Sequence, residues 1–301
     1  MSDISSVYWF DKSTVKHLRF PFSYHLMPVF LFALSQTADI NWKNTAVAFI
    51  ILHFFIYPAS NGYNSYQDRD ETSIGGIKHP PKVTENLFYA TLLLDITGIL
   101  TALYVSVYFS LFVLIYVLVS RAYSYRNLRL KKYAWVGFLT VMVFQGGFSY
   151  LMVFSATKTD FTWTMLNQSS VLCMLVASFF IGSVYPLTQI YQHRSDRADG
   201  VTTISYKLGY TGTFVFSSLL FFCALIVLSF HFMLIEKQVY FLLFLLLMLP
   251  VVGRLLYWFI NVRKDVSKAD FDNTMTMNLL ASSCMNVYFI ILTVNNHYNW
   301  F

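Results

Sequence analysis

Charged residues are scarce in this sequence of 301 residues, and their scarcity excludes whole classes of protein. Lysine, arginine, aspartate and glutamate together make up 12% of the chain, whereas an average soluble domain carries about 25%. Hydrophobic residues make up 56%. Because so few charges cannot cover a water-soluble globule, a soluble enzyme and a disordered chain are both excluded. We expect a membrane protein whose partners include membrane lipids and no nucleic acid.

Cysteine is also rare, and its positions exclude two further classes. Cys173, Cys223 and Cys284 lie far apart inside apolar runs. They lack the spacing of zinc ligands, and they cannot supply the disulfide framework of a small secreted protein. The apolar runs are continuous and do not alternate with polar residues, which argues against a transmembrane β-barrel. The composition therefore predicts an all-α membrane protein.

Apolar stretches long enough to cross a bilayer as a helix recur along the chain. The nine predicted spans are residues 20–36, 45–61, 87–104, 105–121, 133–155, 168–190, 212–233, 239–260 and 277–296. Residues 87–121 are almost unbroken, and at ~1.5 Å per residue they are too long for one crossing of ~30 Å. We therefore divide them into two helices joined by a minimal turn. The predicted fold is a bundle of nine transmembrane helices around a central cavity.

The basic residues are distributed unequally between the two sides of this bundle. Lys43, Lys158 and Lys237 fall on one side and Arg254 within a span, while the other seventeen bases fall on the opposite side. The positive-inside rule then places the N-terminus and the loops after the second, fourth, sixth and eighth helices in the cytosol. We expect an integral multi-pass protein of the cell inner membrane. The dense group of bases at 121–132 is attributed mainly to topology and lipid contact, with a role at the diphosphate as the less favoured alternative.

Two polar segments at predicted cytosolic helix ends share one spacing. Each has two amides followed by two carboxylates, at offsets 0, 3, 7 and 10. The residues are Asn61, Asn64, Asp68 and Glu71 in the first segment, and Gln189, Gln192, Asp196 and Asp199 in the second. On an α-helix these offsets share one face. The recurrence predicts an internal duplication, with two pseudo-repeats that face each other across a cavity.

The oxygen atoms of these side chains suit Mg²⁺, which is usually held by one or two carboxylates together with substrate phosphates. Two such helix ends, each holding a Mg²⁺ ion, would share one diphosphate between them. Bases close to the two segments would balance the remaining phosphate charge. These bases are Arg69, Lys78, Lys82, Arg194, Arg197 and Lys207.

At these residues the chain resembles the UbiA superfamily of intramembrane prenyltransferases, over essentially its whole length. The first family motif is Asn-x-x-x-Asp-x-x-x-Asp. Asn64 and Asp68 match its first two positions, and the third falls on Thr72. Asp70 or Glu71 is expected to replace the missing carboxylate, and the internal symmetry favours Glu71.

The second family motif, Asp-x-x-x-Asp, is also matched in part. Asp196 matches its second position, while the first falls on Gln192. Tyr191 stands where many members of the superfamily have arginine. Amide carbonyls are still able to bind Mg²⁺, so these departures are compatible with catalysis. They argue against a standard ubiquinone, menaquinone or haem O enzyme.

The resemblance implies one domain over residues 1–301, with motif loops at about 61–85 and 189–210. It implies an enzyme that uses Mg²⁺ to transfer an isoprenyl group from a prenyl diphosphate to an aromatic, quinone-precursor-like acceptor or another lipid. The implied metal ligands are Asn64, Asp68, Glu71, Gln192, Asp196 and Asp199, with Asp68 and Asp196 as catalytic residues. The implied diphosphate-binding residues are Arg69, Lys78, Tyr191, Arg197 and Lys207.

Asp95 lies within the third predicted span, where a carboxylate is costly. One interpretation is a catalytic residue that binds the acceptor or removes its proton. The other is a protonated or hydroxyl-paired residue that serves helix packing. The sequence leaves both interpretations open.

Two other functions remain open at the level of sequence. A secondary transporter built from two repeats would also carry carboxylates, but near the bilayer midplane, whereas here they cluster at one end of the helices. The departures at Thr72 and Gln192 also fit a catalytically degenerate protein that binds a prenyl lipid without turnover.

Overall fold

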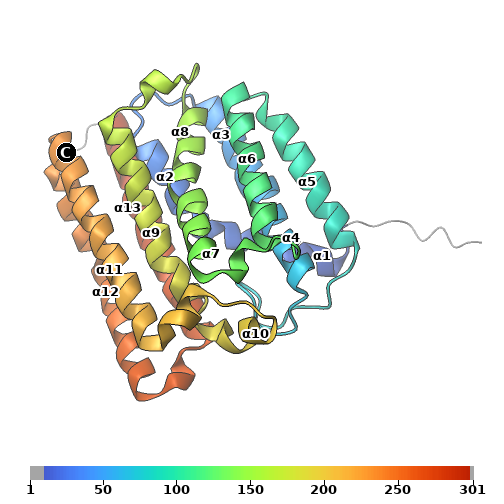
Figure 1. The fold of residues 1–301 in the computed structure, drawn as a ribbon. Helices are drawn as coiled ribbons and strands as arrows, with labels where there is room; N and C mark the ends of the chain where they lie inside the picture. The colour runs from blue at the N-terminus through green and yellow to red at the C-terminus, as the bar shows by residue number, and fades with distance from the viewer. Residues whose placement is uncertain (1–9, 299–301) are drawn as a thin grey trace, which may run out of the picture.

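The computed structural model describes residues 10–298, and most of them are helical (Figure 1). Within this part of the chain, β-structure is limited to one antiparallel bridge between Ile74 and Ile77. The α-helices are α1 Lys12–Leu18, α2 Met27–Ser35, α3 Trp42–Ile50, α4 Tyr57–Asp68, α5 Asn86–Ala102, α6 Val107–Ser124, α7 Ala134–Val141, α8 Ser149–Thr157, α9 Gln168–Thr188, α10 His193–Ala198, α11 Ile204–Leu234, α12 Gln238–Lys264 and α13 Phe271–Tyr298. The predicted all-α fold class is confirmed.

Seven helical segments of the described chain are long and apolar enough to cross a membrane. They are Trp42–Asp68, Val107–Ser124, Ala134–Thr157, Gln168–Ala198, Ile204–Leu234, Gln238–Lys264 and Phe271–Asn296. A shorter apolar helix, α5, has 17 residues. These segments agree with the predicted spans from residue 45 onwards in position and in order.

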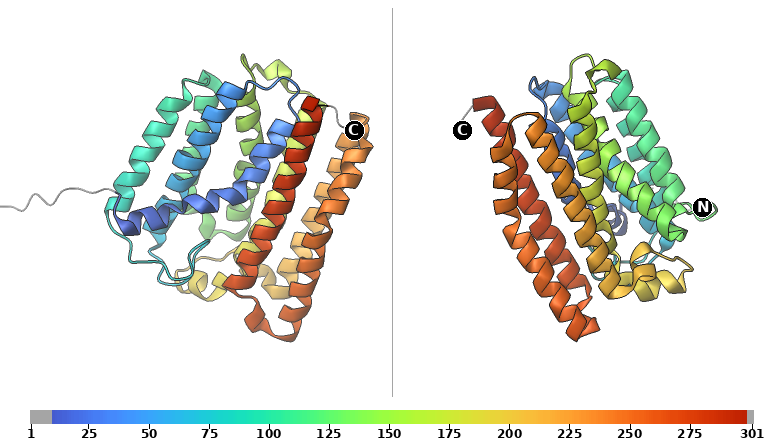
Figure 2. Two further views of the ribbon diagram at one scale, coloured as in Figure 1. Left: turned by 180° about the vertical axis from the view of Figure 1, so that it is seen from behind. Right: turned by 60° about the vertical axis from the view of Figure 1, so that its left-hand side comes forward.

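The first predicted span, residues 20–36, is not a single transmembrane helix. Phe20–Leu26 forms a 3₁₀-helix, η1, which runs across the bundle, and only α2 runs along it (Figure 2). Pro28 lies in the first turn of α2. Because proline has no backbone N–H to continue a preceding helix, it favours a change of direction at this point. The predicted count of nine spans is therefore not confirmed.

The predicted division of residues 87–121 into two helices is confirmed. α5 ends at Ala102, and α6 begins at Val107 and lies beside it (Figure 1). The side chain of Ser106 accepts a hydrogen bond from the backbone N–H of Phe109 at 3.0 Å. This bond satisfies one of the free donors at the start of α6.

The two ends of the bundle carry different connections. α10 and the loops that follow α4, α6 and α12 lie together at one end, the lower end of Figure 1. The loops that follow α5, α8 and α11 lie at the other. The basic loops predicted to share one side therefore do gather at one end, which we call the α10 end.

Aromatic pairs hold several of the long helices together. The ring of Phe32 in α2 stacks on Phe289 in α13, with centroids 4.7 Å apart. The ring of Phe180 in α9 stacks on Phe244 in α12 at 5.4 Å. Large buried rings of this kind contribute both apolar area and a specific mutual geometry. These pairs join α2 to α13 and α9 to α12.

A π-helical segment, η4 Met142–Phe148, joins α7 to α8 and contacts α9 through its backbone. A Cβ atom added to Gly146 would lie 2.5 Å from the Cα of Ser178. The N–H of Gly147 donates a hydrogen bond to the Ser178 hydroxyl at 3.0 Å. Glycine at these two positions therefore permits a contact that no side chain would allow.

We expect Gly146→Ala to destabilise the protein by about 1–3 kcal/mol, because the new methyl group overlaps the α9 backbone. The matched control is Gly253→Ala in α12, where an added Cβ meets no atom within 4 Å. It should leave stability unchanged or raise it by up to about 1 kcal/mol. Thermal unfolding of the detergent-solubilised protein measures both, and an equal loss in the two variants would contradict this account of η4.

Candidate active site

A cavity of about 300 Å³ opens between the helices near the α10 end. Its walls come from η1, α2, α4, α6, η4, α9, α10 and α13. The charged side chains that line it are Arg19, Asp68, Asp70, Arg129, Lys131, Asp196 and Asp199. Much of the remaining wall is aromatic or aliphatic, and includes Phe32, Phe144, Phe180 and Phe289. The predicted central cavity is therefore present.

The first polar segment, which begins at Asn61 and was expected to be helical as far as Glu71, is helical only as far as Asp68. α4 ends there, and Arg69 adopts a left-handed conformation, with φ of 53°, that redirects the chain. Glu71 consequently leaves the helix face, is exposed to solvent and does not line the cavity. Asp70 lines it instead. The structure thus places Asp70, and not the expected Glu71, in the cavity wall, because α4 does not extend beyond Asp68.

The second polar segment is not one helix. α9 ends at Thr188, Ile190–Gln192 forms a short 3₁₀-helix, and α10 follows. Gln192, Asp196 and Asp199 nevertheless all line the cavity. The equal spacing in the two segments therefore does not give equal local structures, although both segments reach the same space.

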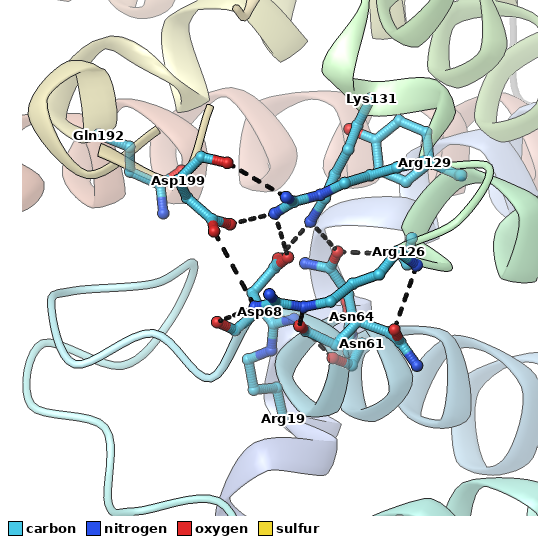
Figure 3. Close-up of polar contacts among 12 residues, drawn as sticks. Arg19, Asn61, Asn64, Asp68, Arg126, Arg129, Lys131, Gln192 and Asp199 are labelled. Atoms are coloured by element: carbon cyan, nitrogen blue, oxygen red, sulfur yellow. Dashed lines mark hydrogen bonds and ion pairs between the residues drawn. The ribbon is translucent and has the colours of Figure 1, made fainter. Parts of the chain in front are cut away.

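Ion pairs join the two segments across the cavity (Figure 3). The Arg129 guanidinium contacts the Asp68 carboxylate at 3.1 Å and pairs with Asp199 as well. The Lys131 ammonium pairs with Asp68 and donates to the side-chain oxygen of Asn64 at 2.8 Å. The side chains of Asp68, Arg129 and Lys131 are at most 10% exposed, so each of these charges depends on its partners.

Arg129 and Lys131 both line the cavity, although the sequence analysis attributed these bases mainly to topology and lipid contact. The run of bases after α6 was the feature in the sequence that could have indicated their position. No local pattern showed that the loop between α6 and α7 folds towards the cavity. Arg129 itself has a positive φ of 43°, a costly conformation for arginine. The pairing with Asp68 and Asp199 offsets that cost.

Arg19, at the start of η1, also lines the cavity and was not predicted to do so. Its guanidinium donates hydrogen bonds to the backbone oxygens of Asn61 at 2.9 Å and Gly75 at 3.1 Å. Burial lowers the pKa of Arg19 to about 10, so the group remains cationic at neutral pH. It ties η1 to the first motif loop.

Two of the carboxylates, those of Asp196 and Asp70, are not fully paired. One carboxylate oxygen of Asp196 is buried and has no hydrogen-bond partner among the described residues. Burial and the adjacent Asp68 carboxylate raise the pKa of Asp70 to about 6. Buried negative charge without full compensation is what a site leaves for an incoming cation.

The sequence model of the UbiA prenyltransferase family matches residues 26–280. The chain belongs to the UbiA prenyltransferase family. The predicted family is thus confirmed, and with it the expectation of an integral membrane enzyme of the prenyltransferase class. No curated protein matches the chain.

Two solved structures have the same fold at low sequence identity. One is a UbiA homologue from Archaeoglobus fulgidus bound to GPP and Mg²⁺, with a TM-score of 0.67 and 14% identity over 94% of this chain and 100% of that one. The other is digeranylgeranylglyceryl phosphate synthase, with a TM-score of 0.61 and 17% identity over 95% and 98%. At these identities the likeness concerns the fold alone.

The bases that the sequence analysis assigned to the diphosphate lie mostly outside the cavity of this UbiA family protein. Arg69 pairs with Glu85 at 2.6 Å, and Lys78 with Asp272 at 2.6 Å. Arg197 and Lys207 are exposed and do not line the cavity. Tyr191 is the exception and does line it. Arg69 and Lys78 follow α4, Arg197 lies in α10 and Lys207 in α11, so closeness to the motifs in sequence does not bring these side chains into the cavity.

Asp95 also lies outside the cavity, where it pairs with Arg121 of α6. The Arg121 Nε atom donates to the Asp95 carboxylate at 2.8 Å, and its guanidinium lies 3.9 Å from the ring centroid of Tyr63 in α4. Asp95 is 5% exposed. The contacts favour a role in packing, but through an ion pair with Arg121 that joins α5 to α6, and not through the protonated or hydroxyl-paired state considered from the sequence.

We expect Asp95→Leu and Arg121→Met, each made alone, to destabilise the protein by about 3 kcal/mol, because each leaves the other residue's charge buried without a partner. The double variant Asp95→Leu with Arg121→Met removes both charges and should recover most of that loss. Thermal unfolding of the single and double variants tests the pairing. If the double variant is as unstable as the two single losses added together, the residues are not coupled.

Proposed function

We propose that this protein transfers an isoprenyl group from a prenyl diphosphate to an aromatic or other lipid acceptor, with Mg²⁺ as cofactor. One observation carries the proposal: a single cavity joins a cluster of seven charged side chains to a largely aromatic and aliphatic wall. A prenyl diphosphate has the same division, with an anionic head and an apolar tail. A single domain, as predicted from the sequence, would supply both parts.

The oxygen donors of the cavity fit Mg²⁺ that is shared with a substrate. No group of three or more histidine, cysteine, aspartate or glutamate side chains in the described chain is arranged to hold a metal ion alone. Mg²⁺ commonly takes one or two carboxylates and completes its shell with phosphates and water. Asp68 and Asp196 would hold it, with Asp70 or Asp199 and the Asn64 amide oxygen as further donors.

Arg129 and Lys131 would take part in binding the diphosphate head. Both are already in the cavity, and both are held by carboxylates that Mg²⁺ would also use. When Mg²⁺ engages these carboxylates, the two bases are free to turn towards the phosphate oxygens. Charge-assisted contacts of this kind are the stronger hydrogen bonds of proteins.

In the proposed reaction, the allylic C–O bond breaks and its electron pair leaves with the diphosphate. The acceptor supplies the electron pair of the new bond to the allylic carbon and then loses a proton. Bound Mg²⁺ would neutralise charge on the leaving diphosphate. Phe144 and Phe180 line the cavity, where their rings would stabilise cationic character on the allyl group.

The orientation in the membrane is part of the same proposal. All but a few of the bases belong to the α10 end, which by the positive-inside rule faces the cytosol. A water-soluble prenyl diphosphate head would then reach Asp68 and Asp196 from the cytosol, while its tail remains among apolar side chains. The inner membrane of the cell stays the predicted location.

The decisive variant combines Asp68→Ala with Asp196→Ala. We expect it to abolish Mg²⁺-dependent transfer from geranyl diphosphate, by at least about a hundredfold, in membranes supplied with a mixed panel of acceptors. The matched control is Glu71→Ala, an exposed carboxylate beside the same motif, which should retain activity. Products are identified by mass spectrometry.

Three outcomes would contradict the proposal. Transfer that survives in the double variant would exclude the two carboxylates as essential. Uptake of a solute by proteoliposomes without any prenyl product would indicate a transporter. Tight, Mg²⁺-dependent binding of geranyl diphosphate with no turnover on any acceptor would indicate a binding protein.

A further inference from the structure

We infer that His193 is a positioning residue, which anchors α10 to the start of α11 and thereby sets the place of the Asp196 carboxylate in the cavity. His193 is 7% exposed and does not itself line the cavity. The inference rests on the proposed function and deepens it, because it gives a task in the same site to a residue outside the cavity wall.

α10 is too short to hold its own position. It has six residues, whereas isolated helices shorter than about 12–15 residues are marginal even in favourable sequences. Its flanks give no support from a longer helix, since Ile190–Gln192 is a 3₁₀-helix and Gly200 has a positive φ of 69°. The position of α10 therefore depends on contacts with other parts of the fold.

His193 makes the contact with α11 at three points. Its Nε2 atom lies 2.8 Å from the Ser205 hydroxyl. Its ring packs against that of Tyr210, with centroids 4.8 Å apart, and edge-on against that of Tyr206 at 5.6 Å. Arg197 adds a weaker contact, with its guanidinium 6.0 Å from the Tyr206 ring. One face and one edge of the imidazole are thus engaged by the first turns of α11.

Ser205 is a fixed partner for this imidazole. Its hydroxyl lies 3.0 Å from that of Thr213, which donates to the backbone oxygen of Gly209 at 2.7 Å. Because a carbonyl only accepts and each hydroxyl has one hydrogen to donate, the chain of bonds runs from His193 through Ser205 and Thr213 to Gly209. Gly209 has a positive φ of 68° that interrupts α11. These bonds hold the first turn of α11 across the interruption.

The anchor matters because the Asp196 carboxylate is not held by partners of its own. One of its oxygens is buried and has no hydrogen-bond partner among the described residues, whereas Asp68 is held by Arg129 and Lys131. The position of Asp196, three residues after His193 on α10, therefore follows from the position of the α10 backbone. Removal of a group that orients a metal ligand commonly weakens metal binding about tenfold to a hundredfold.

The test measures Mn²⁺ binding to the detergent-solubilised protein by electron paramagnetic resonance, together with transfer from geranyl diphosphate. His193→Phe keeps a ring against Tyr206 and Tyr210 but removes the hydrogen bond to Ser205. It should weaken Mn²⁺ binding about tenfold. His193→Gln returns an N–H donor at a similar reach and should restore the affinity to within about threefold of the unaltered protein.

The matched control is His231→Phe at the other end of α11. His231 is also buried, and its Nε2 atom also lies 2.8 Å from a side-chain oxygen, that of Gln36. His231→Phe should lower the midpoint of thermal unfolding, as His193→Phe does, but leave Mn²⁺ binding unchanged. Ser205→Ala provides a milder variant of the anchor. It should weaken Mn²⁺ binding as His193→Phe does, and the two changes combined should weaken it no further.

Two results would overturn the inference and leave the proposed function in place. One is Mn²⁺ affinity that is unchanged in both His193→Phe and Ser205→Ala, and the other is an equal loss of affinity in His231→Phe. Additive losses in the double variant would also overturn it, because the two residues would not act as one unit. Absence of both Mn²⁺ binding and prenyl transfer in the unaltered protein would overturn the proposed function and this inference together.

Discussion

The ion pairs from Arg129 to Asp68 and Asp199 are the contacts on which the charged end of the cavity depends. They join the end of α4 to the turn after α10 through a loop that belongs to neither. Buried charges are tolerated only when they are paired. Because Arg129 and Lys131 balance the carboxylates here, a dense acidic site can exist inside a membrane bundle. In the proposed function, the same balance would leave the carboxylates available to a metal ion once a diphosphate attracts the two bases.

The composition of the rest of the cavity wall reflects the confinement of the charged side chains to the α10 end. Away from that end, the wall is built of aromatic, aliphatic and neutral polar side chains. Rings such as Phe32 and Phe289 hold α2 against α13, and η1 crosses the bundle to complete the wall. The division of the cavity matches the division of a prenyl diphosphate. In the proposed function, the diphosphate head would lie at the charged end and the prenyl tail among the apolar side chains.

Much of the fold could be predicted from the sequence because hydropathy and basic-residue bias are summed over many residues. The division between α5 and α6 was predicted for this reason, as was the gathering of basic loops at one end. The site was predicted less completely. The spacing drew attention to Asp68 and Asp196, which both line the cavity, whereas Asp70 lines it and Glu71 does not, because α4 ends at Asp68 before the left-handed Arg69. The inward path of Lys131 depends on tertiary folding that no local pattern encodes.

The central claim is that a diphosphate and Mg²⁺ bind between the two motif segments at the α10 end. The most direct measurement is an experimental structure of the protein with a non-hydrolysable analogue of geranyl diphosphate and Mn²⁺, which anomalous scattering locates in place of Mg²⁺. The account predicts metal density in contact with Asp68 and Asp196, with Arg129 and Lys131 turned towards the phosphates. Density for the diphosphate at Arg69 or Lys78, or metal bound away from both aspartates, would contradict it.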